Sequence, residues 1–246
     1  MAKKVIFLIL LSVSLSLFVG CGTTAKFVYP SKYDNLIQLY KEPKYSLKVA
    51  VLPFEEKRGD ENSFAGFWLY LIPIVPYGQI SYDRPDAARV FNTINEFNFN
   101  VVEDIAKAVV TSLKRSNLFQ DVYFTFGGDK SEADLIITGD VISTKYVGKT
   151  YSYGLSVYGP VLWFFGLPAG SSEDALSLKI YLNKQGGKTT LWEYAFDKDD
   201  SIVQGLYYKW GHDVKAYTSL MEEGMNEAIK SLDEKLSNIP LEKLKE

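Results

Sequence analysis

Only one cysteine and one histidine occur among the 246 residues, and this scarcity restricts how the chain can be stabilised. A single cysteine excludes an internal disulfide and any zinc or iron–sulfur site that needs several cysteines, and a single histidine excludes any site with two imidazoles. The fold therefore depends on a hydrophobic core. With 47% hydrophobic residues, a chain of this length can bury a sizeable one.

The charge balance argues against a nucleic-acid partner. The chain carries 27 basic and 30 acidic residues, a formal net charge of -3, whereas nucleic-acid-binding proteins normally show a basic excess. We also expect no cofactor, no metal site and no catalytic residues.

The N-terminus has the pattern of a secretory signal peptide. Lys3 and Lys4 form a positive start, and residues 5–18 form an apolar stretch too short to span a bilayer. Residues 17–21, Leu-Phe-Val-Gly-Cys, resemble the bacterial lipoprotein box, although Phe18 stands where that box usually has leucine. The resemblance implies cleavage before Cys21 and its lipidation, with palmitate among the acyl chains.

A lipid anchor would also determine where the protein resides. Cleavage removes two of the basic residues, so the mature chain would be anchored by lipid rather than by a polybasic patch. Gly22, the second mature residue, resembles the default for outer-membrane sorting. We therefore expect a periplasm-facing lipoprotein of the cell envelope, in the outer rather than the inner membrane.

The remaining pattern predicts one α+β domain with a mostly antiparallel sheet covered by two main helices. Apolar strand patterns cover residues 46–54, 119–126, 133–142, 176–183 and 188–196, and the last two are predicted to form a hairpin. Helical spacing covers residues 101–116 after a capping box at Asn100, with Asn117 as the stop, and residues 214–236 after Asp213 as N-cap. We thus predict a signal peptide (1–20), a lipidated flexible tether (21–45), the domain (46–236) and a C-terminal tail (237–246).

Two uncharged segments do not fit this pattern. Residues 64–78 and 158–168 are rich in aromatic residues and interrupted by proline and glycine. They could pack together as a hydrophobic flap over the sheet, or they could form an exposed patch that contacts a partner, a neighbouring subunit or the membrane surface. We expect the second segment to lie beside the first in space and to form the functional surface with it, through Trp68, Leu71, Ile72, Trp163, Phe164 and Phe165.

Three short motifs have simpler structural interpretations. Residues 186–190 imitate part of a phosphate-binding loop but are predicted to form a hairpin turn. The His212–Asp213 neighbours indicate a helix entry. Residues 197–200 lack the glycine and the ligand spacing of a calcium loop and are predicted to form a solvated turn.

The order of elements in residues 46–143 resembles the N-terminal module shared by TolB, the curli secretion lipoprotein CsgG and the penicillin-binding-protein activator LpoB. The resemblance rests on residues 49–54, 113–119 and 133–139. It implies a periplasmic, membrane-tethered, non-enzymatic module. The two aromatic segments are not part of that module.

Together these patterns predict a lipid-anchored envelope interaction protein that is not an enzyme. Its partners would be the membrane, through the N-terminal lipid, and an envelope protein or a second copy of the chain. The alternative is an envelope protein that binds a small ligand or lipid in a pocket lined by the same aromatic loops.

Overall fold

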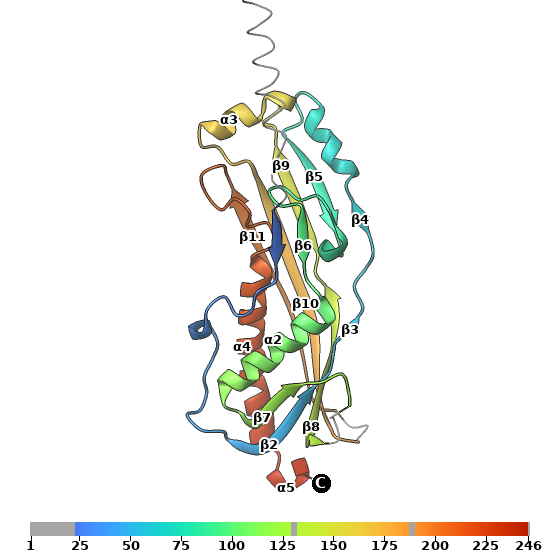
Figure 1. Cartoon of the computed structure of the whole chain (residues 1–246), viewed down its shortest axis with the longest axis vertical. Helices are drawn as coiled ribbons and strands as arrows, with labels where there is room; N and C mark the ends of the chain where they lie inside the picture. The colour runs from blue at the N-terminus through green and yellow to red at the C-terminus, as the bar shows by residue number, and fades with distance from the viewer. Residues whose placement is uncertain (1–22, 129–131, 187–189, 246) are drawn as a thin grey trace, which may run out of the picture.

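The computed structural model describes residues 23–128, 132–186 and 190–245 (Figure 1). Cys21 and the leader lie outside these residues. One sheet contains nine of the described strands: β2 (Tyr45–Val51), β3 (Glu55–Glu56), β4 (Asn62–Ser63), β5 (Tyr77–Tyr82), β7 (Phe119–Phe124), β8 (Leu135–Ser143), β9 (Tyr146–Tyr151), β10 (Gly170–Lys184) and β11 (Thr190–Gln204). A separate parallel pair joins β1 (Thr24–Lys26) to β6 (Glu96–Asn98).

Two long helices and several short ones complete the described chain. The long helices are α2 (Val101–Ser116) and α4 (Ala216–Ser237). The short helices are α3 (Pro160–Phe164), α5 (Leu241–Lys245) and the 3-10 turns η1 (Tyr33–Asn35), η2 (Ala65–Leu71), η3 (Pro85–Ala87) and η5 (Ser156–Tyr158).

Strand β10 joins the two halves of the sheet. It pairs with β11 over residues 170–183, with β9 over residues 170–174 and with β8 over residues 177–184, all antiparallel. Beyond β9 follow β5 and β4, whereas beyond β8 follow the parallel strands β2 and β7. The β9 half and the β8 half therefore lie at opposite ends of an elongated molecule (Figure 1).

The alternating sequence of β10 explains its position. Leu176, Leu178, Ile180 and Leu182 are each at most 1% exposed, and the residues between them point to the other face. Leu178 lies opposite Phe196 of β11 and Val141 of β8. Burying a side chain of this size stabilises the fold by about 1.5–3 kcal/mol, so this stripe forms the centre of the core.

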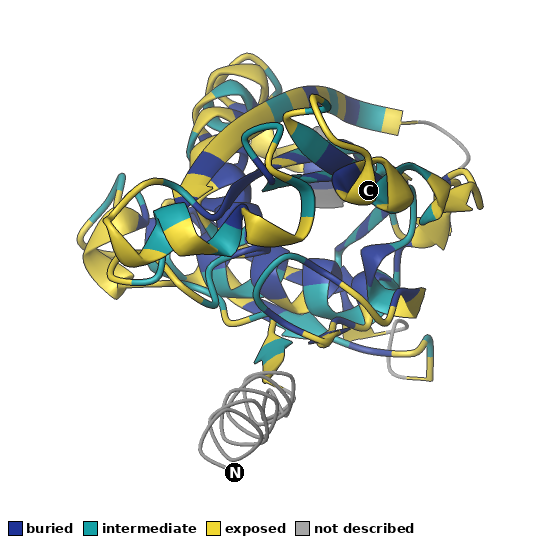
Figure 2. Ribbon diagram, turned by 90° about the horizontal axis from the view of Figure 1, so that it is seen from above, coloured by how far each residue is buried: buried dark blue, intermediate teal, exposed yellow. Residues whose placement is uncertain are grey.

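Helices α2 and α4 cover the sheet with their apolar sides. Helix α4 packs on β10 and β11, and α2 packs on β7 and against α4. Figure 2 shows the buried residues gathered in the interior and the exposed residues around the periphery. Helix α2 ends at Asn117 in the left-handed conformation (φ 54°), as predicted. The predicted α+β class, with a mostly antiparallel sheet and two main helices, is confirmed.

The helix starts differ from their predicted form. At α2, the Asp104 carboxylate rather than that of Glu103 accepts the backbone N–H of Asn100, at 2.9 Å. Helix α4 begins at Ala216, with Lys215 as its N-cap. Asp213 is not its cap. Its fully buried carboxylate instead accepts hydrogen bonds from the Tyr146 hydroxyl of β9, the Gln204 amide of β11 and the Thr93 N–H, which precedes β6.

Residues 27–44, predicted as part of a flexible tether, lie against the domain, and we call them the N-terminal strap. Leu36 is only 4% exposed. Ser31 and Asn35 donate hydrogen bonds to the Glu222 carboxylate of α4, and Lys44 forms an ion pair with Asp233 at 2.6 Å. The apolar residues of the strap are spaced irregularly, so no periodic pattern indicated that they are packed.

Two further segments differ from the predictions. Residues 197–200 lie within β11 rather than in a turn. Lys198 there bridges Glu223 and Glu227 of α4, at 2.7 and 2.9 Å. In the predicted tail, Leu244 of α5 is buried.

Candidate functional site

The short helices η2 and α3 lie at one end of the molecule, beyond the β5 and β9 ends of the sheet (Figure 1), and expose many apolar side chains there. The exposed surface consists of η2 with the residues after it, and of η5, α3 and the residues after α3. We call this surface the apolar end. Twelve large hydrophobic side chains there, with the adjoining Leu155 included, are between 37% and 89% exposed: Trp68, Leu69, Leu71, Ile72, Ile74, Leu155, Val157, Tyr158, Val161, Phe164, Phe165 and Leu167.

Two hydrogen bonds to backbone carbonyls join the two parts of the apolar end. The Ser156 hydroxyl donates a hydrogen bond to the Leu71 carbonyl at 2.7 Å, and the Ile74 N–H donates to the Gly154 carbonyl at 2.9 Å. Strand β5 follows the first segment and strand β9 precedes the second, and these two strands are paired along six residues. Residues 71–74 of the first segment thus contact residues 154–156, which lead into the second segment.

The inner side of η2 is packed against the sheet, which fixes its outer side. Tyr70 is 8% exposed, and Phe67 stacks on its ring. A Cβ atom on Gly66 or Gly78 would lie 2.5 Å from a backbone oxygen across the contact, so η2 can approach β5 only because glycine occupies these positions. The apolar end is therefore a supported surface rather than a loose loop.

Five of the six predicted contact residues are exposed, and Trp163 differs from them. Trp68, Leu71, Ile72, Phe164 and Phe165 are 43–77% exposed. Trp163 is half-buried, and its indole N–H donates a hydrogen bond to the Tyr151 carbonyl at 3.0 Å. Trp163 therefore attaches α3 to β9, while its neighbours Phe164 and Phe165 face outward.

This difference predicts unequal effects on stability. Replacing Trp163 with alanine should lower the free energy of unfolding by about 2 kcal/mol, because packing and a hydrogen bond are lost at a half-buried site. Phe165→Ala should change it by at most about 0.5 kcal/mol, since this side chain is 77% exposed. Urea denaturation of both variants checks the prediction, and equal losses would contradict it.

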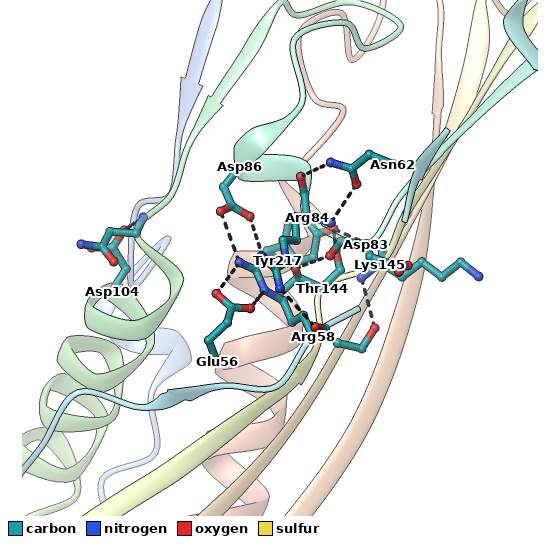
Figure 3. Close-up of polar contacts among 12 residues, drawn as sticks. Glu56, Arg58, Asn62, Asp83, Arg84, Asp86, Asp104, Thr144, Lys145 and Tyr217 are labelled. Carbon is teal, nitrogen blue, oxygen red and sulfur yellow. Dashed lines mark hydrogen bonds and ion pairs between the residues drawn. The ribbon is translucent and has the colours of Figure 1, made fainter. Parts of the chain in front are cut away.

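An ion-pair cluster centred on the buried Arg58 joins β3, η3 and the residue after β8, and no sequence pattern predicted it (Figure 3). The Arg58 guanidinium donates to both oxygens of Glu56 and of Asp86, at 2.5–3.2 Å, and to the Thr144 hydroxyl at 2.7 Å. Its side chain is 1% exposed. Burial alone would lower the pKa of Arg58, but the hydrogen bonds to Glu56 and Asp86 outweigh burial and raise it.

A second buried group joins β9, β10, β11 and the start of α4. The Asp213 carboxylate accepts hydrogen bonds from Thr93, from the Tyr146 hydroxyl at 3.1 Å and from the Gln204 amide at 3.0 Å. Asp174 is also fully buried, and neither of its carboxyl oxygens has a hydrogen-bond partner of normal geometry among the described residues. Its pKa lies well above the usual range because of burial and the charge of Asp213, although the nearby Ala216 N–H favours the charged form.

The raised pKa of Asp174 predicts that the free energy of unfolding falls as pH rises. An unfolded aspartate has a pKa near 3.9, so between about pH 4 and its higher folded pKa this group binds more protons in the folded state. Its contribution to stability therefore falls as pH rises, by up to about 1.4 kcal/mol per pH unit. Asp174→Asn should remove this slope and be the more stable protein at neutral pH. Denaturation series at several pH values check this, and parallel curves for the two proteins would contradict it.

Arg58, Asp174 and Asp213 are buried in these two clusters, and Arg58 and Asp213 are paired with groups from other elements, so both clusters join parts of the fold. His212 lies next to Asp213 in sequence but contacts Lys215 at 3.0 Å, while Asp213 points inward. The described residues contain no group of three or more acidic, histidine or cysteine side chains that could hold a metal ion. Among the helices that the structure describes, none is long and apolar enough to cross a membrane.

Comparisons with known proteins identify no relative by sequence, since neither a family model nor a curated protein matches the chain. Several solved structures are similar at low identity. A DUF330-family protein from Xanthomonas campestris is 11% identical, with a TM-score of 0.42 over 85% of this chain and 92% of its own. A PelC dodecamer from Paraburkholderia phytofirmans is 12% identical, with a TM-score of 0.34 over 75% and 90% of the two chains. A neuraminyllactose-binding hemagglutinin homologue from Helicobacter pylori is 12% identical, with a TM-score of 0.35 over 91% and 97%.

Proposed function

We propose that this chain is a lipid-anchored, non-enzymatic interaction protein of the cell envelope, which makes contact through its apolar end. The lipid would be attached to Cys21, and the protein would face the periplasm. The predicted relation to the TolB, CsgG and LpoB module is part of this proposal. The segments on which that resemblance rests lie in β2, at the junction of α2 and β7, and in β8.

One observation carries the proposal: the apolar end is exposed, and neither of its segments contains a charged residue. Residues 64–78 and 155–168 contain no Asp, Glu, Lys or Arg, while Trp68 is 61% and Phe165 77% exposed. Contiguous apolar surface of this kind on a folded domain indicates a contact with a partner or a membrane. The surface is also packed against the sheet on its inner side. It can therefore bind a partner without the entropy cost of ordering a loop.

The lipid anchor makes a direct prediction. Cys21→Ser should abolish labelling of the protein by radioactive palmitate in growing cells, because no other thiol is present to accept an acyl chain. The natural sequence should be labelled under the same conditions. Continued labelling of the Cys21→Ser variant would contradict this assignment.

The alternative is a small-ligand or lipid-binding protein with a pocket formed by the aromatic loops. In the structure η2 and α3 turn several of their large side chains outward, which favours a contact surface. Two surface hollows of about 630 and 540 Å³ are lined by other parts of the chain, around Lys145 and Asp200 and around Thr23 and Thr218.

Crosslinking in cells separates the two functions. If the protein acts by contact, a photo-crosslinking residue at position 165 should capture a defined envelope component, and one at position 126 should not. A ligand-binding protein should instead retain a hydrophobic molecule when purified without detergent as a monomer, which native mass spectrometry would detect. Capture at neither position together with a retained ligand would favour the alternative.

A further inference from the structure

The described chain starts in the half of the molecule that carries the apolar end (Figure 1). The Thr23 hydroxyl donates a hydrogen bond to the Thr93 carbonyl at 3.1 Å, and the Thr23 carbonyl accepts one from Asn95 at 3.0 Å. The Thr93 hydroxyl in turn accepts the Gly211 N–H at 2.9 Å. Thr23 is therefore held beside the turn that follows β11.

The same turn contacts the apolar end. The Tyr207 hydroxyl donates a hydrogen bond to the Phe164 carbonyl of α3 at 3.0 Å. Tyr207 is 69% exposed and Trp210 44%, so the turn extends the aromatic surface toward the start of the chain. One turn thus connects the position of Thr23 to α3.

The distance that an anchor could reach follows from the chain itself. Cys21 precedes Thr23 by two residues, and an extended residue spans at most about 3.3–3.6 Å, so the two Cα atoms lie within about 7 Å. Acyl chains on Cys21 would enter the bilayer from this side of the molecule. The membrane would then be the largest apolar phase next to the apolar end.

From these positions we infer that the apolar end docks into the surface of the membrane that holds the lipid anchor; this inference rests on the proposed lipidation. Aromatic side chains favour the interface between lipid headgroups and acyl chains. Amphipathic elements at that interface bury their apolar face about 5–10 Å deep. Trp68, Phe164 and Phe165 would enter this layer, and Lys209 on the adjacent exposed turn would lie at headgroup level. The anchored domain would then have one fixed orientation, with β7 and β8 away from the membrane (Figure 1).

A pair of labelled variants tests the orientation. Phe165 and Phe126 are almost equally exposed, at 77% and 75%, but Phe126 follows β7 in the half of the molecule away from α3 (Figure 1). Phe165→Cys and Phe126→Cys are each produced as the full lipidated chain and labelled with a fluorophore. Each protein is then reconstituted into vesicles of phosphatidylethanolamine and phosphatidylglycerol, with and without a quencher on the acyl chains.

Docking predicts that the label at position 165 loses fluorescence to the acyl-chain quencher and that the label at position 126 does not. If the protein floats with the vesicles but both labels remain unquenched, the docking inference is wrong while the lipid anchor stands, and a protein partner for the apolar end is favoured. If mass spectrometry shows no acyl chain, the proposed anchor is wrong. Quenching of the label at position 165 by added vesicles would then still support docking. If that label is not quenched either, the docking inference is wrong.

Discussion

Arg58→Met is expected to lower the free energy of unfolding by about 2–3 kcal/mol, because the buried guanidinium is the shared hydrogen-bond partner of Glu56 and Asp86, whose side chains are 34% and 23% exposed. The guanidinium makes five hydrogen bonds, and methionine replaces its volume but none of its donors. Glu56 and Asp86 come from different parts of the chain, one before η2 and one in η3, so the loss affects how that region is joined to the sheet. Urea denaturation followed by circular dichroism measures the change.

The matched control is an ion pair of the same kind at the surface. Lys149 contacts Glu173 at 2.7 Å, but both side chains are partly solvated. Lys149→Met should therefore cost at most about 1 kcal/mol. If both variants lose the same amount, the Arg58 cluster does not contribute in the way that its burial indicates.

The second large effect concerns association rather than stability. We expect the double variant Trp68→Ser and Phe165→Ser to bind isolated envelope membranes at least about tenfold more weakly than the natural sequence. Burying one aromatic side chain contributes about 1.5–3 kcal/mol, and each 1.4 kcal/mol is a factor of ten in binding. Partition of the mature chain, made from Gly22 without its lipid, is measured by co-sedimentation so that the anchor does not hide the effect.

Phe126→Ser serves as the control for this experiment. It removes an aromatic side chain of nearly the same exposure from the opposite end, so it should leave the partition unchanged. Thermal unfolding of all three proteins should agree closely, since exposed positions contribute little to stability. Equal partition of the double variant and the Phe126→Ser control would show that the apolar end makes no contact with the envelope.

The sequence was most informative where one face of an element is buried along its whole length. The alternation of Leu176, Leu178, Ile180 and Leu182 indicated β10, and the helical spacing after Asn100 indicated α2, because both patterns repeat over several residues. The stop at Asn117 was also predictable, since asparagine tolerates the left-handed conformation. These elements define the fold class.

The features that were not predicted from the sequence have physical reasons. The N-terminal strap packs through scattered apolar residues and through hydrogen bonds to Glu222 and Asp233 of α4, which are nearly 200 positions away. Residues 197–200 look like a polar turn because β11 lies at the edge of the sheet, where charged side chains can face solvent. The Arg58 cluster joins Glu56, a near neighbour in sequence, to Asp86 and Thr144, which are 28 and 86 positions away, so the whole cluster could not be predicted from a local pattern.

Composition singled out the two uncharged segments of the apolar end, but it did not show which of their residues face outward. Residues 64–78 and 158–168 lack charge, which indicated a shared surface. Whether a given aromatic residue supports that surface or faces outward depends on its contacts. Trp163 and Phe165 belong to the same uncharged run, yet only the indole of Trp163 finds a backbone partner in β9.

Oxidative footprinting of Phe165 and Phe126 in intact cells tests the central claim most directly. In the purified protein the two rings should be oxidised to a similar extent, because their exposures are 77% and 75%. In the envelope we predict that Phe165 is protected severalfold while Phe126 reacts as before, since only the apolar end is covered. Equal oxidation of both rings in cells and in the purified protein would contradict the account.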